Sequence, residues 1–125
     1  MLVRCEKSFR HQISEGNIYL VIEILINRAN SKISYRIIDI DGIPAIYDSE
    51  NFEIVSESVN GMCIFTNAVQ ISVTHKRIID SKLQDENIDG FWGAYIENDI
   101  VAKEILQLVV EDLATYENVD VPRLV

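Results

Sequence analysis

The sequence predicts a single α+β domain, in which a predominantly antiparallel sheet or small barrel is packed by a C-terminal helix. Three observations support this fold class. The chain has 125 residues, which suffices for one hydrophobic core but not for two. Residues 1–66 hold several short runs with strand patterns, and residues 99–117 hold one long stretch with helical periodicity. Because no linker or internal repeat separates these parts, we expect residues 1–125 to form one domain.

The N-terminal region predicts a pair of strands. Residues 2–7 alternate apolar and polar side chains, as a half-buried strand does, and residues 14–17 then supply turn-forming side chains. The apolar run over residues 18–27 follows and predicts a buried strand. Glu23 interrupts this run, which is about half of the ~20 residues that a helix needs to cross a bilayer.

The next segment predicts a hairpin. Residues 34–40 are rich in β-branched and aromatic side chains and end at Asp41-Gly42, a favoured hairpin turn. Residues 43–47 supply the second strand, and Pro44 suits either an edge strand or the start of a strand.

Three further strands are predicted after this hairpin. Residues 52–56 alternate again, and Asn60-Gly61, the strongest turn dipeptide in the chain, introduces a strand over residues 62–66. Val69, Ile71 and Val73 alternate within a final strand over residues 68–74. Apolar residues at helical spacing then predict a short helix or turn within residues 75–83.

The C-terminal region predicts the one long helix. Asp99 is a suitable N-cap for a helix from Ile100 to about Tyr116, and Asn118 and Pro122 end it. Apolar side chains recur at three- and four-residue intervals along this helix, so we expect them to pack against the sheet. They are Ile105, Leu106, Val109, Val110, Leu113 and Tyr116.

The charge of the chain excludes one class of function. It has 11 Lys and Arg against 20 Asp and Glu, a formal net charge of -9, which opposes the binding of phosphate backbones. We therefore expect no nucleic-acid partner. The N-terminus lacks the apolar region of a secretory signal, and no membrane span is evident, so we expect a cytoplasmic protein without a membrane partner. Cys5 and Cys63 are expected to be reduced, with at least one of them buried.

No catalytic, cofactor-binding or metal-binding motif is recognised. His11 and His75 are the only histidines, and neither lies in a metal-ligand or nucleophile motif. The five glycines are scattered, which argues against a phosphate-binding loop or a dinucleotide fingerprint. Asp39-Ile40-Asp41-Gly42 resembles the start of a calcium loop, but its glycine comes two positions too early, so the turn interpretation is favoured. We expect a protein that is not an enzyme and needs no cofactor.

Two acidic stretches are the candidate partner-binding surface. If they lie on one side of the fold, they form a continuous negative surface that would speed association with a basic partner. The alternative is an ordinary solvated surface that keeps the protein soluble. The carboxylates proposed to bind the partner are Asp39, Asp41, Asp48, Glu50, Asp85, Asp89 and Asp99.

Adjacent aromatic residues form a second candidate. Phe91 and Trp92 lie between two glycines, which would place at least one ring away from the core, and Tyr95 follows. Because Trp and Tyr are enriched at the centres of interfaces, Trp92 or Tyr95 is a candidate partner anchor. The alternative is that Phe91 and Trp92 pack the long helix onto the sheet.

The segments over residues 15–19, 35–39 and 52–55 resemble a small barrel module of bacterial and phage proteins, with Asn17 where that motif has lysine. The whole arrangement, with its Gly-Phe-Trp segment and acidic C-terminal helix, resembles the immunity proteins of bacterial polymorphic-toxin and contact-dependent growth inhibition systems. This resemblance implies a non-enzymatic protein that binds and blocks a cognate toxin domain, often a basic nuclease, inside the producing cell.

Two other classes of function stay open. One is a non-enzymatic small-barrel binding or scaffold module of a phage or chromosomal operon. The other is an enzyme with an unrecognised site. Whichever of the three functions applies, the chain is expected to be a monomer or a homodimer.

Overall fold

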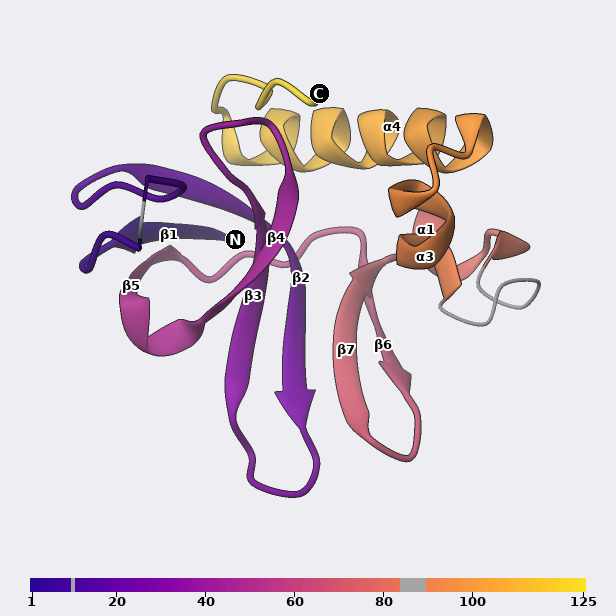
Figure 1. Ribbon diagram of the computed structural model, residues 1–125, viewed down its shortest axis with the longest axis horizontal. Coiled ribbons are helices and arrows are strands. Elements are labelled where there is room, and N and C mark those ends of the chain that lie inside the picture. Colours follow the sequence, from indigo (N-terminus) through magenta and orange to yellow (C-terminus); the bar gives the residue numbers. More distant parts are fainter. Residues whose placement is uncertain (10, 84–89) are drawn as a thin grey trace.

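The computed structural model describes residues 1–9, 11–83 and 90–125, which form a seven-stranded antiparallel sheet with helices against one face (Figure 1). The predicted α+β class is confirmed. Of the two arrangements considered, the chain forms an open sheet, not a closed barrel. The elements are β1 (Leu2–Cys5), β2 (Ile18–Asn27), β3 (Ile33–Ile38), β4 (Pro44–Asp48), η1 (Ser49–Asn51), β5 (Phe52–Ser56), β6 (Met62–Thr66), β7 (Gln70–His75), α1 (Lys76–Ile79), α3 (Gly90–Ile96) and α4 (Ile100–Glu117).

Strand β2 organises the sheet because it pairs with three other strands. The order along the main path is β4-β3-β2-β1-β5, while β7 pairs with the second half of β2 and β6 pairs with β7. Strand β4 is therefore an edge strand and begins at Pro44, so this proline occupies both of the positions that it was expected to suit. The Asn60-Gly61 turn leads into β6 as expected, but β6 pairs with β7 and makes no hairpin with β5.

A bulge in β2 decides which side chains face the helices. The pairing of β2 with β3 shifts by one residue between Val21 and Glu23, so Ile22 is an extra residue in the ladder. Ile22 packs in the core under α4, and the next side chain, Glu23, also reaches toward the helices. Without the bulge, alternation would direct these neighbours to opposite faces.

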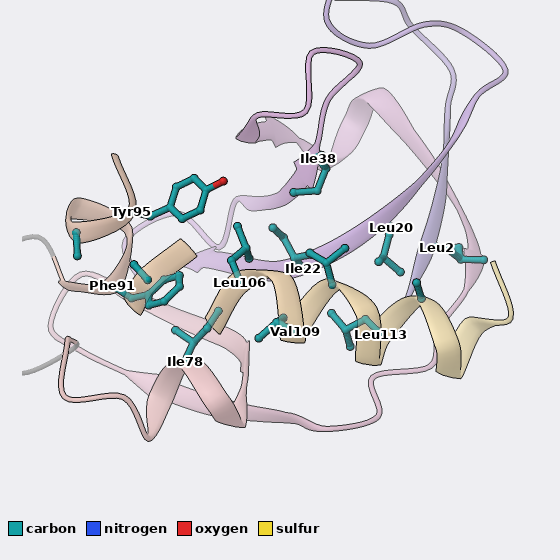
Figure 2. Close-up of a cluster of buried hydrophobic side chains, with 14 residues drawn as sticks. Leu2, Leu20, Ile22, Ile38, Ile78, Phe91, Tyr95, Leu106, Val109 and Leu113 are labelled. Carbon is teal, nitrogen blue, oxygen red and sulfur yellow. The ribbon is translucent and has the colours of Figure 1, made fainter. Parts of the chain in front are cut away.

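The larger core lies between the sheet and the helices (Figure 2). Four predicted positions of α4 are buried there: Leu106, Val109, Val110 and Leu113. The prediction was wrong for Tyr116, which is exposed. At about 100° of rotation per residue, Tyr116 lies at the flank of the buried stripe.

The ends of the helices follow local rules. Asp99 accepts a hydrogen bond from the Ala102 N–H at 2.9 Å, as its predicted role at the N-cap of α4 requires. Asn118 ends α4 in the left-handed conformation at φ 55°. The short helix expected within residues 75–83 is α1, and the His75 side chain caps it.

A second core lies on the other face of the sheet. Four aromatic rings meet there, from Tyr19, Tyr35, Tyr47 and Phe52. Ile13 covers them from the segment between β1 and β2. The rings of Tyr47 and Phe52 lie 6.4 Å apart although their strands occupy opposite ends of the main path, so these five strands curl strongly.

The two cysteines differ in environment, which gives a direct test of the fold. Cys5 is buried in the second core, and burial raises the pKa of its thiol, whereas Cys63 is exposed on β6. Since the thiolate is the reactive form, we expect one fast-reacting thiol in the folded chain and two in denaturant, measured with a chromogenic disulfide reagent. Cys63→Ser should remove the fast phase, and two fast thiols in the folded protein would contradict the fold.

Candidate functional site

Asp39, one of the predicted partner-binding carboxylates, is buried in the turn between β3 and β4. Its side chain accepts hydrogen bonds from the N–H groups of Asp41 and Ile43, at 2.9 and 3.0 Å. Such bonds stabilise a turn from within. Asp39 therefore shapes this turn, and its carboxylate is not part of the exposed surface.

Two further carboxylates of the predicted set also have local partners. Asp48 accepts from the Glu50 N–H at the start of η1 and pairs with the Lys32 ammonium at 2.9 Å. The backbone hydrogen bond from Glu50, followed by the bond from Lys32, lowers the pKa of Asp48. Asp99 caps α4. Asp41 and Glu50 are exposed, whereas Asp85 and Asp89 lie outside the described residues.

The predicted aromatic anchors belong largely to the core. The neighbouring Phe91 ring is fully buried and packs edge-on against Trp92, at 5.0 Å between ring centres. Tyr95 is buried, which raises the pKa of its phenol, and Trp92 is half-buried against the same cluster. These positions support the packing interpretation of the Gly-Phe-Trp segment.

A buried polar cluster joins α3 to the sheet. The Glu23 side chain, 5% exposed as a residue, accepts hydrogen bonds from Arg36 Nε at 3.0 Å, Thr74 Oγ1 at 2.7 Å and Trp92 Nε1 at 3.4 Å. The Arg36 guanidinium also lies 4.0 Å from the centre of the Trp92 ring. Burial lowers the pKa of Arg36, and the Glu23 charge opposes that shift. Sequence analysis missed this cluster, although Glu23 inside an apolar run was its signal.

A cavity of about 300 Å³ lies beside this cluster, between the β3–β4 turn, α3, the start of α4 and Val125. Arg36 and Lys103 supply cationic groups to its lining, and Trp92 and Tyr95 supply aromatic ones. The described residues of the lining include no His, Cys, Ser, Thr or carboxylate side chain. These cationic and aromatic side chains suit the binding of an apolar group that carries a negative charge.

The outward face of α4 is an acidic and apolar surface that sequence analysis did not single out. Glu104, Glu111 and Asp112 are exposed there, and Val101 and Leu108 are exposed between them. Helical rotation of about 100° per residue places all five on the side opposite to the buried stripe. The sequence already indicated that this helix is acidic, because Lys103 is the only Lys or Arg between Ile100 and Glu117.

Asp112 also links α4 to the sheet. Its Oδ2 lies 2.7 Å from Nε2 of His75, the buried residue that ends β7 and caps α1. About half of the Asp112 side chain stays exposed, at 51%. This contact ties α4 to the end of β7, so the outward face of the helix is fixed in place, which favours a preorganised binding surface.

Among the described residues, no three His, Cys, Asp or Glu side chains are placed to hold a metal ion. In the same part of the chain, no helix has both the length and the apolar character to cross a membrane. Comparison with family models, curated proteins and solved structures finds no match to the chain.

Proposed function

We propose that this chain is a non-enzymatic, immunity-type protein that binds and neutralises a cognate bacterial toxin domain inside the producing cell. The outward face of α4 is the observation that carries this proposal, because Glu104, Glu111 and Asp112 are exposed there around Val101 and Leu108. The partner expected for such a surface is a basic protein, such as a nuclease domain. The resemblance to immunity proteins, which rests in part on the same acidic helix, supports this function.

The physics of association favours this mixture of side chains. Carboxylates attract a basic partner over long range and raise the association rate, which the net charge of -9 reinforces. Exposed aliphatic side chains lose contact with water on binding and slow dissociation. Asp41 and Glu50, which are also exposed, would add to the negative field.

The cavity beside Arg36 favours a second candidate, a non-enzymatic binding or scaffold module of a phage or chromosomal operon, built on the open sheet instead of the small barrel first expected. Its aromatic and cationic lining is suited to a small anionic group. The neighbouring gene separates the two candidates. A large secreted protein with a variable C-terminal domain favours the immunity function, and phage or unrelated operon genes favour the module.

The test compares two double variants that change the net charge equally. Glu104→Lys with Glu111→Lys alters the outward face of α4, whereas Glu6→Lys with Glu15→Lys alters exposed residues near β1. At low salt, we expect the first pair to slow association with the toxin domain of the adjacent gene about tenfold or more, and the second pair to have a much smaller effect. Association rates by stopped flow and survival of co-expressing cells are the measurements.

Two outcomes would overturn this proposal. If both double variants slow association equally, the outward face of α4 is not the interface. If the unmodified chain neither binds the toxin domain of the adjacent gene nor protects cells against it, the proposed toxin-neutralising function is wrong.

A further inference from the structure

The outer edge of β6 presents backbone groups that no described strand pairs. Among the described strands, β6 pairs with β7 alone. Just outside β6, the Gly61 carbonyl accepts from the Lys76 N–H and the Asn67 N–H donates to the Gln70 carbonyl, both at 3.0 Å. Since every second residue of an antiparallel strand bonds to the same neighbour, the backbone groups of Cys63 and Phe65 face β7. Those of Ile64 and Thr66 consequently face outward.

An aliphatic surface continues to this edge on the sheet face opposite to the helices. Pairing across β2, β7 and β6 aligns Ile24, Val73 and Ile64 in one row. Ile24 packs toward the second core, which fixes the face on which this row lies. Ile24 and Val73 are half-buried, and Ile64 is 73% exposed. The β6–β7 and β2–β3 hairpins extend away from α4, so this helix leaves the ends of both hairpins uncovered (Figure 1).

The same hairpin carries no charge that would protect its edge. No Asp, Glu, Lys or Arg lies between Glu57 and Lys76, in a chain with a net charge of -9. Edge strands of soluble proteins usually carry charged side chains or proline, which discourage pairing with another chain. This edge has neither, and its central side chain is isoleucine.

We infer that β6 pairs with β6 of a second copy of this chain, and that the two copies form a symmetric homodimer. Two copies repel each other through their acidic surfaces, and the uncharged hairpin is where they can meet without like charges in contact. An aliphatic row is complementary to itself, as a two-fold interface requires, whereas a basic partner would gain no charge attraction there. This inference goes beyond the proposed function and does not depend on it.

The outward backbone groups define the pairing. With Ile64 on the two-fold axis, Ile64 of each copy exchanges hydrogen bonds with Ile64 of the other, and Met62 lies opposite Thr66. This register spans β6 and uses the Ile64 groups, the Thr66 N–H and the Met62 carbonyl. The Met62 N–H takes no part, because it already donates to the Val59 carbonyl at 3.0 Å. The two aliphatic rows then join across the axis into one continuous surface.

The test is the molecular mass in solution of the full chain and of two matched variants. Ile64→Lys and Ile96→Lys make the same charge change at isoleucines that are 73% and 76% exposed, but only Ile64 lies on β6. At about 100 μM, light scattering should give the unmodified chain and Ile96→Lys twice the 14.3 kDa of one chain. Ile64→Lys should raise the dimer dissociation constant about tenfold or more, because the two new charges would face each other across the axis.

Chemical cross-linking gives a second measurement. In this register the Cα atoms of the two Cys63 residues lie about 7–8 Å apart, which is too far for a direct disulfide but within reach of a short bis-maleimide. The reagent should link two unmodified chains through Cys63, and Ile64→Lys should reduce the yield. The circular dichroism spectra of Ile64→Lys and Ile96→Lys should be the same, which would show that both variants are folded.

Two results would overturn the inference. One is an unmodified chain that stays monomeric at about 100 μM, in which case β6 would be free to pair with a strand of a different protein. The other is equal dimerisation of Ile64→Lys and Ile96→Lys.

Discussion

Arg36→Met should lower the free energy of unfolding by about 3–5 kcal/mol, because it leaves the Glu23 carboxylate buried without its countercharge. Glu23 is 5% exposed and receives the Arg36 Nε–H at 3.0 Å. The variant keeps the hydrogen bonds from Thr74 and Trp92 but loses the guanidinium that stacks on the Trp92 ring. Denaturation by guanidinium chloride, followed by far-UV circular dichroism, measures the loss.

A double-mutant cycle separates the charge from the packing. Glu23→Gln keeps an oxygen that accepts hydrogen bonds but removes the negative charge, so combining it with Arg36→Met leaves no unpaired charge. We expect the double variant to be more stable than the sum of the two single changes predicts, by about 2–3 kcal/mol. Strict additivity would show that the two side chains do not interact in the folded protein.

Phe91→Ala should also cost about 3–5 kcal/mol of folding stability, because a fully buried phenyl ring leaves a cavity that its neighbours only partly fill. Its ring lies in the core between α3, α4 and the sheet, as Figure 2 shows. The urea concentration at the midpoint of unfolding should fall, while the slope of the free energy of unfolding against urea concentration stays unchanged.

Phe9→Ala is the matched control for this substitution. Phe9 is 45% exposed and packs edge-on against Tyr47, so its loss should cost about 1 kcal/mol. Equal effects of the two substitutions would contradict the position of Phe91 in the main core.

Much of the secondary structure could be predicted because its causes are local. The alternation over residues 52–56 and the Asp41-Gly42 turn correspond to β5 and to the β3–β4 hairpin. Asp99 caps α4 through a group only three residues away, the Ala102 N–H. These signals depend on side chains and backbone atoms within a few residues of each other, so the sequence displays them directly.

The candidate site could be predicted only in part. The charges of Asp39, Asp48 and Asp99 predict a binding surface, but each carboxylate bonds to backbone N–H groups close to it in sequence. Only for Asp99 did the sequence also predict this local role, as the N-cap of α4. Carboxylates at turns and helix starts are common for this reason, so charge at such positions is a weak guide to a binding surface. The acidic face of α4 became recognisable once the buried stripe fixed which side of the helix faces outward.

The sequence alone determined the α+β class, the positions of most strands along the chain, the long helix and its caps, and the negative net charge. Only the tertiary structure decided that β6 pairs with β7 at an open edge, and that a bulge at Ile22 directs Glu23 toward α3. It also decided the partners of Glu23, since Thr74 and Trp92 lie 51 and 69 residues away along the chain. Local preferences carry no information about contacts at such separations, which form only when burial of the apolar faces brings the elements together.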